Sequence, residues 1–309
     1  MRTDPLSDLL RLARVEVMVT GEFHAGGTWA IHFPPPLGLK FCAVTHGEAW
    51  VRPDGETGFH HVRAGNVILM NTSAGYTLAS SPEAIPVEAE DLRDITCPGE
   101  RVFSYQGGED FRQFGGHIQL DTGLSRPLAE VIPACAVVLS DTPEAASLQW
   151  MIRQLMNERT AQNPGYRLVA NQLAQMLFVQ ALRMFLDQTR TSGNSSWLRA
   201  MIDARLLPAL NCMHDNPGRD WSLEDLADAA AMSRTSFANR FREVAGTTPL
   251  SYLTQWRMLL AREHLREGNR PIGTWVEEIG YTSESSFSHA FKRFVGISPA
   301  QYRQQLRGA

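Results

Sequence analysis

The spacing of hydrophobic residues changes once along the chain. Over residues 15–120, short runs of strand-forming residues are separated by glycine and proline, and four such runs are residues 29–33, 40–44, 49–52 and 66–70. Short strands at near-regular spacing, with turn residues between them, are typical of a β-sandwich or β-barrel. The sequence therefore predicts a β domain in the N-terminal part.

Beyond residue 142 the apolar residues follow helical spacing. Residues 142–144 (Thr-Pro-Glu) form a typical helix start, and Leu148 and Ile152 lie on one face of the helix that follows. Residues 163–165 (Asn-Pro-Gly) break this helix, and a second helix is predicted over residues 168–186. Because this second helix is apolar over a wide arc, it packs either on the chain's own β domain or on a partner.

The polar residues 191–196 form the best candidate for a domain boundary. The remainder of the chain is predicted to be helical. The predicted fold class is α+β with three parts. These parts are a β domain over residues 1–140, linker helices with a dimerisation region over residues 141–196, and an all-α domain over residues 197–309.

An internal repeat marks the all-α domain. Residues 233–252 and 283–302 align without a gap, and seven of the twenty positions are identical. Each copy begins with a serine suited to cap a helix, carries two phenylalanines four residues apart, and has a glycine where the helix ends. Two copies are too few for a solenoid, so a duplicated helical module is the better interpretation.

A short amphipathic helix is predicted before each copy, at residues 222–230 and 272–279, and the first begins with Ser222 and Asp225 as a capping box. A helix, a tight turn and a second helix is the arrangement that places a recognition helix in the major groove of DNA. We therefore predict two helix-turn-helix units, at about residues 222–245 and 272–295.

Residues 221–309 resemble the DNA-binding domain of the AraC/XylS transcription regulators. In the second unit the resemblance is carried by Ile279-Gly280-Tyr281, Ser283-Glu284, Ala290-Phe291-Lys292-Arg293-Phe294, Ser298-Pro299 and Tyr302-Arg303. In this family a connecting helix, here at about residues 249–266, sets the two recognition helices about one DNA turn apart. The resemblance implies a sequence-specific, ligand-responsive activator, with promoter DNA, RNA polymerase, a small-molecule effector and a second copy of the chain as partners.

The face opposite the paired phenylalanines is expected to contact DNA. That face carries ten residues: Arg234, Thr235, Ala238, Asn239, Arg242, Glu284, Ser285, Ser288, His289 and Lys292. Edge chemistry matches Asn239 to adenine, Glu284 to the cytosine amino group and Arg234 to guanine or a phosphate. A phosphate contact is the alternative for each residue. Arginine is common in the family at the positions of Asn239 and His289, so the resemblance does not give the target sequence.

The N-terminal part resembles the cupin-type sensor domain of one branch of these regulators, in residues 4–10, 27–29, 40–41, 50 and 64–66. A cupin is a small jelly roll. Metal-binding cupins carry an H-x-H pair, whereas His60 and His61 are adjacent and would point to opposite faces of a strand. We predict no metal and no cofactor, and a zinc site formed by Cys42, His46 and Cys97 is the alternative. The residues that line an effector pocket cannot be assigned from the sequence.

Composition and charge agree with this picture. The chain is 43% hydrophobic and 20% charged, it contains no apolar run of ~18 residues that would predict a membrane span, and its first residues do not form a signal peptide. We expect a cytoplasmic, nucleoid-associated protein with four reduced cysteines. Although the net charge is −4, residues 234–307 contain 11 basic and 6 acidic residues, which suits a phosphate-binding surface.

Three other functions are open at this point: a metal-dependent cupin enzyme with an appended helical domain, an effector-independent repressor, and a helical module that binds protein. The enzyme requires a metal triad that the sequence does not offer, so we expect no enzymatic activity. Binding to duplex DNA that weakens steeply with salt would distinguish the regulators from the protein-binding module.

Overall fold

The computed structural model describes residues 4–36, 38–71, 73–95, 102–119, 132–138, 145–188, 195–268 and 270–307. Its contacts divide the chain into two compact units, a β unit of residues 14–188 and a helical unit of residues 1–13 and 189–309. This division differs in two places from the predicted one. The first residues group with the helical unit, and the predicted linker helices group with the β unit.

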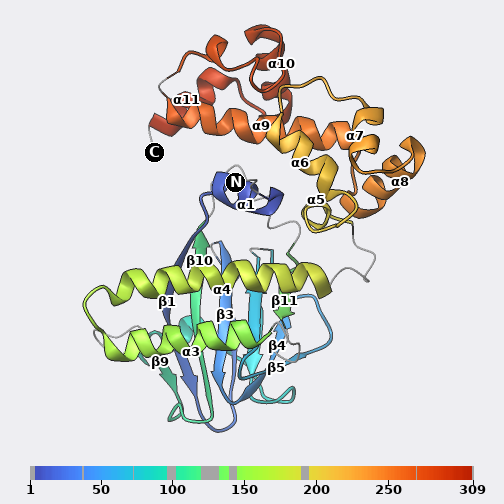
Figure 1. Ribbon diagram of the computed structural model, residues 1–309. Helices are drawn as coiled ribbons and strands as arrows, with labels where there is room; N and C mark the ends of the chain where they lie inside the picture. Colours follow the sequence, from blue (N-terminus) through green and yellow to red (C-terminus); the bar gives the residue numbers. More distant parts are fainter. Residues whose placement is uncertain are drawn as a thin grey trace. The chain divides into compact units, whose positions relative to one another are not determined.

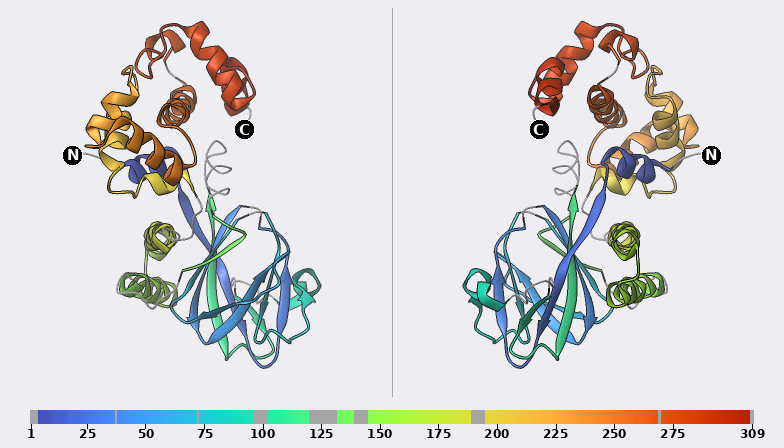
Figure 2. Two further views of the ribbon diagram at one scale, coloured as in Figure 1. Left: turned by 90° about the vertical axis from the view of Figure 1, so that its right-hand side faces the viewer. Right: turned by 90° about the vertical axis from the view of Figure 1, so that its left-hand side faces the viewer.

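The β unit is a sandwich of two sheets, drawn in Figures 1 and 2. The first sheet has the strand order β11-β6-β3-β10-β1-β9 and the second has the order β5-β4-β7-β2-β8. The strands are β1 (Glu16–Ala25), β2 (Ala30–Phe33), β3 (Leu39–His46), β4 (Glu48–Pro53), β5 (His60–Arg63), β6 (Val67–Met70), β7 (Tyr76–Ala79), β8 (Val87–Glu88), β9 (Val102–Tyr105), β10 (Phe111–Gln119) and β11 (Cys135–Val138), with a 3-10 segment η1 (Ala89–Ile95) after β8.

The four predicted strands are present as β2, β3, β4 and β6. The sequence did not reveal β10, which pairs with both β1 and β3, because the glycine pair Gly115-Gly116 interrupts its apolar pattern. Gly116 is required by packing, since a Cβ atom there would collide with the ring of Phe41 on β3 and with the carbonyl oxygen of Met18 on β1. Glycine usually disfavours a strand, but at residue 116 it makes room for the Phe41 ring of the neighbouring strand.

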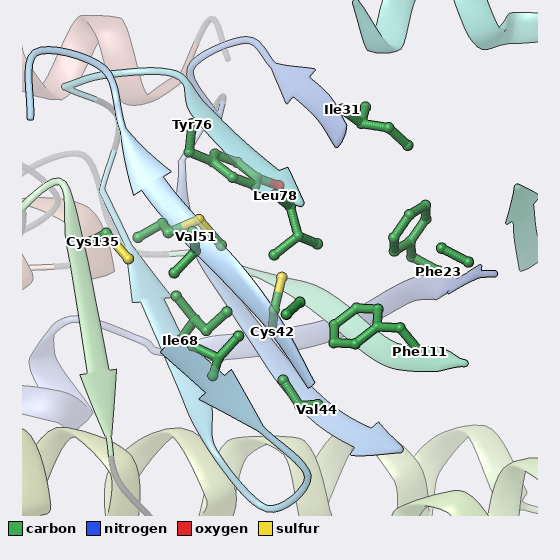
Figure 3. Packing of buried hydrophobic residues seen from close by; sticks show 14 of the residues in the cluster. Phe23, Ile31, Cys42, Val44, Val51, Ile68, Tyr76, Leu78, Phe111 and Cys135 are labelled. Carbon is green, nitrogen blue, oxygen red and sulfur yellow. The ribbon is translucent and has the colours of Figure 1, made fainter. Parts of the chain in front are cut away.

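The core of the β unit lies between the two sheets (Figure 3). Both sheets contribute apolar side chains to it, and the labelled members are Phe23, Ile31, Cys42, Val44, Val51, Ile68, Tyr76, Leu78, Phe111 and Cys135. Inward-facing residues alternate with residues on the other face of each strand, as expected for a jelly roll.

Two helices, α3 (Ala145–Ala161) and α4 (Tyr166–Gln188), cover the outer face of the six-stranded sheet (Figure 1). Nε of Arg159 on α3 donates to Oε1 of Glu22 at 3.0 Å, and Nε2 of Gln175 on α4 donates to the carbonyl of Val15 at 2.9 Å. The buried face of α4 thus packs on the chain's own sheet, the first of the two alternatives. The predicted helix start at residues 142–144 lies outside the described residues.

The helical unit consists of α1 (Pro5–Leu12), α5 (Trp197–Ala200), α6 (Leu207–Asp215), α7 (Leu223–Ala229), α8 (Arg234–Ala245), α9 (Pro249–Glu267), the 3-10 turn η3 (Ile272–Thr274), α10 (Glu284–Val295) and α11 (Pro299–Arg307). The predicted connecting helix is confirmed as α9, which starts at Pro249 and ends at a left-handed glycine, Gly268. The capping box of Ser222 and Asp225 is present at the start of α7.

The predicted helix over residues 272–279 is wrong. Only residues 272–274 form a 3-10 turn, and hydrogen-bonded turns follow up to Gly280. Pro271, Gly273 and the β-branched residues after them disfavour an α-helix. Trp275 and Val276 are buried. The conformation of this segment is therefore fixed by tertiary packing and not by helix propensity.

The N-terminal helix α1 packs on α6 and α9 of the helical unit. Asp4 caps it by accepting from the backbone N–H of Ser7 at 3.0 Å, and Leu6, Leu9 and Leu12 are buried. Its Asp8 carboxylate lies 3.5 Å from Nδ1 of His214 on α6. Residues 4–10, which resemble part of a sensor domain in sequence, thus belong to a helix that packs into the core of the helical unit. None of the helices in the described ranges combines the length and the apolar composition that crossing a bilayer requires.

Candidate nucleic-acid interface

The two recognition helices predicted by the repeat, α8 and α10, begin and end alike. The hydroxyl of Ser233 accepts from the N–H of Ser236 at 3.2 Å, and that of Ser283 accepts from the N–H of Ser286 at 3.1 Å. Both helices end at a glycine in the left-handed conformation, with φ of 69° and 91°. A residue with a Cβ is strained at this φ, so glycine is required at both ends.

The phenylalanine pairs fix the inner face of each helix. Phe237 and Phe241 are fully buried with ring centroids 5.7 Å apart, and Phe241 meets Tyr252 of α9 edge-on at 5.7 Å and 72°. In the second unit the corresponding pair is 5.5 Å apart, and Phe291 meets Tyr302 of α11 at 5.5 Å and 72°. The duplicated sequence therefore produces a duplicated packing arrangement.

The outer faces of α8 and α10 also match. Eight of the ten residues predicted to contact DNA are exposed: Arg234, Thr235, Asn239, Arg242, Glu284, Ser285, His289 and Lys292. The remaining two, Ala238 and Ser288, occupy equivalent positions and are half-buried.

Most of these side chains form no hydrogen bond or ion pair with other described residues. Within the described residues, the side chains of Arg234, Asn239 and His289 make no hydrogen bond or ion pair. Asn239 has both an amide donor and an acceptor, which is the combination that pairs with the edge of adenine. Glu284 differs, because a Cβ atom at Gly273 would lie 2.5 Å from its Oε1, so its carboxylate rests against η3.

Arg240 does not belong to this face. Its Nη2 donates to Oδ2 of Asp203 at 2.6 Å, and its Nε lies 3.3 Å from Oδ1. Asp203 is itself buried, at 7% exposure. This paired contact attaches α8 to the segment after α5. The corresponding residue of the second unit is Ala290, which cannot form such an ion pair. The contact between Arg240 and Asp203 therefore has no counterpart in α10.

Trp275 is a residue whose role the sequence did not indicate. It is fully buried, stacks with His264 at 4.9 Å and meets Phe287 edge-on at 5.1 Å. It thereby holds the irregular segment before α10 against α9 and α10. A large aromatic residue in a segment of low helix propensity was the available signal.

The histidines and cysteines considered as metal ligands do not come together. His60 and His61 are exposed and pair with separate carboxylates, those of Glu56 and Glu48. Cys42 is buried in the core whereas His46 is exposed at the end of β3, and the predicted third ligand, Cys97, lies outside the described residues. The described part of the chain contains no group of three side chains able to hold a metal ion.

Comparison with known proteins agrees with both units. Residues 4–187 match the family described as Cupin, and residues 226–305 match the family described as Helix-turn-helix domain. A protein described as an AraC-like transcription regulator of Streptomyces lividans is 35% identical over 302 residues, which cover 97% of this chain and 98% of that protein. The RCS-specific HTH-type transcriptional activator RclR of Escherichia coli K12 is 29% identical over 310 residues, covering 98% of each.

Among solved structures, a transcriptional regulator of the AraC DNA-binding type from Chromobacterium violaceum is 26% identical, with a TM-score of 0.33, over 35% of this chain and 96% of that chain. Both relatives that match along the whole chain come from bacteria. With matches to the Cupin family and to the Helix-turn-helix domain family, and a relative named as an AraC-like regulator along the whole chain, this chain belongs to the AraC family of DNA-binding transcription regulators.

Proposed function

We propose that the chain is a ligand-responsive activator that contacts two successive major grooves of promoter DNA with α8 and α10. The observation that carries this proposal is the duplicated outer face. Over residues 234–243 and 284–293 the two helices have the same sequence of buried, half-buried and exposed positions, and their exposed polar side chains can meet base edges and phosphates. The ten residues on that face are the proposed contacts.

The proposal of activation includes RNA polymerase as a partner, because an activator bound beside a promoter acts through the polymerase. The Escherichia coli relative is named a transcriptional activator, which supports the same direction of control here. An effector-independent repressor is the alternative, and the response of DNA affinity to small molecules separates the two.

We also propose that two copies associate through the outer side of α3 and α4. The side of α4 that does not pack on the sheet exposes Leu168, Val169 and Met176, and α3 exposes Trp150, with exposed fractions between 42% and 67%. A second copy of the same helices would cover these apolar residues by an isologous contact. Sedimentation velocity of the wild-type chain and of Met176→Glu tests this, since the added carboxylate would disfavour burial.

We propose further that the chain catalyses no reaction and acts in the cytoplasm at the nucleoid, where its DNA lies. Relatives along the whole chain are named as transcription regulators, which supports a binding function for the cupin unit as well.

Selection of genomic DNA fragments by the purified chain, at two salt concentrations, tests the central proposal. We expect an enriched motif of two short boxes about one helical turn apart and an affinity that falls steeply with salt, because phosphate contacts release counterions. Recovery of fragments that share no motif, with and without a panel of cell metabolites, would contradict sequence-specific regulation.

A further inference from the structure

Lys40 is half-buried, and its ammonium group points between the two sheets of the β-sandwich. Lys40 is two residues from Cys42 and four from Val44 on β3, and both belong to the core between the sheets, so alternation places Lys40 on the same side. Its Nζ donates to Oη of Tyr76 on β7 at 2.9 Å, a bond that joins the two sheets. Nζ also lies 5.6 Å and 5.5 Å from the ring centroids of Phe33 and Tyr76.

This ammonium is surrounded by neutral groups. Burial opposes its charge, whereas the Tyr76 oxygen that accepts the hydrogen bond from Nζ favours it, and the pKa of Lys40 is raised above its usual value. Burial raises the pKa of Tyr76 and of Cys42, so both are uncharged at neutral pH. Burial and the charge of Lys40 lower the pKa of His117, which lies opposite Lys40 on β10. In the described part of the chain, no carboxylate forms an ion pair with Lys40.

A second unsatisfied group lies on the same inner face. Gln113 of β10 is 6% exposed and is paired with Val44 and Phe23, which are both in the core. Its Oε1 has no hydrogen-bond partner. Between Gln113 and Lys40, β10 has Gly115, where a Cβ atom would lie 3.3 Å from Sγ of Cys42 and 3.7 Å from Cε of Lys40. The strand therefore contributes no side chain between the two polar groups.

A largely buried cation without a counter-ion, here Lys40, destabilises a fold. A buried acceptor without a donor, here Oε1 of Gln113, does the same. We propose that the inside of the β-sandwich binds a small apolar monocarboxylate, whose carboxylate pairs with Lys40 and accepts from the hydroxyl of Tyr76. A hydroxyl or amide N–H further along the ligand would donate to Gln113. One positive charge among aromatic and aliphatic side chains suits a singly charged apolar acid better than a polyanion such as a phosphate ester. The inference rests on the proposed function, since it names the chemical class of its effector.

Thermal unfolding of the full chain and of Lys40→Met tests the site. The probes are acetate, butanoate and cyclohexanecarboxylate, each against its neutral amide and against chloride at equal ionic strength. We expect Lys40→Met without ligand to unfold at the same temperature as the wild type or higher, because a buried unpaired charge is removed. We expect at least one of the carboxylates, and not its amide, to raise the Tm of the wild type by about 5 °C at roughly 100-fold excess over Kd, and to lose this effect in Lys40→Met.

The only other lysine, Lys292, provides a matched control on an exposed surface. Lys292→Met should keep the carboxylate-induced rise in Tm. With lysine Cε labelled with carbon-13, the two side chains give two signals, and the Lys40 signal should move on addition of the stabilising carboxylate while that of Lys292 does not. A Lys40→Met chain that unfolds well below the wild type, or carboxylate effects that are equal in the two chains, would overturn the inference.

The outcomes separate this inference from the proposed function. Affinity for the selected DNA fragment is measured with and without the stabilising carboxylate. Lys40-dependent binding that leaves DNA affinity unchanged would support the site and contradict ligand-responsive control. Specific DNA binding with no Lys40-dependent stabilisation by any of the three carboxylates would leave the regulator intact and overturn the site.

Discussion

Replacing Leu9 by alanine tests whether α1 is part of the DNA-binding unit. Leu9 is 0% exposed, and truncating a fully buried leucine costs about 2–5 kcal/mol. An eight-residue helix has no appreciable stability of its own in water, so this loss falls on the docking of α1 against α6 and α9. The undocked population should rise by a factor of roughly 30 to several thousand, since each ~1.4 kcal/mol is tenfold.

Hydrogen exchange of the full chain measures this change directly. In Leu9→Ala, the amides of α1 and those on the α1-facing sides of α6 and α9 should exchange faster by a similar factor, while α10 and α11 stay unchanged. Arg11→Ala is the control in the same helix, because the Arg11 side chain is 74% exposed and pairs only at 3.6 Å with Asp8, a contact worth ~0–1 kcal/mol. Rapid exchange of α1 in the wild type, with α6 and α9 indifferent to the mutation, would refute the docking.

Three further results are expected from local chemistry. Ser222→Ala removes one half of the capping box and should lower the free energy of unfolding by ~1 kcal/mol in a denaturant titration. An unchanged free energy of unfolding would mean that the capping box does not stabilise α7. Burial raises the pKa of Cys42 and raises that of Cys135 to about 12, so both thiols should resist an aromatic disulfide reagent at pH 8 until the chain unfolds, and rapid labelling of the native chain would contradict this. The carboxylates of Glu88 and Asp54 hydrogen-bond the two ring nitrogens of His32 and raise its pKa. The contribution of this contact to the free energy of unfolding is therefore complete below pH ~6.5 and is lost as pH rises through the folded-state pKa of His32. His32→Gln should flatten stability in that window, and an unaltered pH profile would exclude the effect.

The two helices α8 and α10 were predictable from the sequence because their determinants are local. A serine cap, two phenylalanines four residues apart and a glycine stop each act within one helix, and the structure has all of them in α8 and α10. The four strands found from the sequence likewise have short local runs of strand-forming residues.

The features that the sequence did not reveal depend on contacts between distant residues. Gly116 is explained by the ring of Phe41 and the carbonyl oxygen of Met18, which lie on the two neighbouring strands. The 3-10 segment before α10 is held by Trp275 against α9 and α10, a tertiary contact that no local pattern encodes. Lys40 appeared in the sequence as one polar residue in a strand, and only the fold brings it into hydrogen-bond contact with Tyr76 of the opposite sheet.

The measurement that tests the central claim most directly is the base preference of Asn239→Ala and of its counterpart in the repeat, His289→Ala. Each variant is titrated against the selected duplex and against duplexes with single base changes in either box. If α8 and α10 read separate boxes, Asn239→Ala should lose ~1–3 kcal/mol of discrimination at one position of one box and keep the other box intact, and His289→Ala should do the reverse. Equal loss across all sequences, or no loss in either variant, would contradict the assignment of these helices as the readers of DNA sequence.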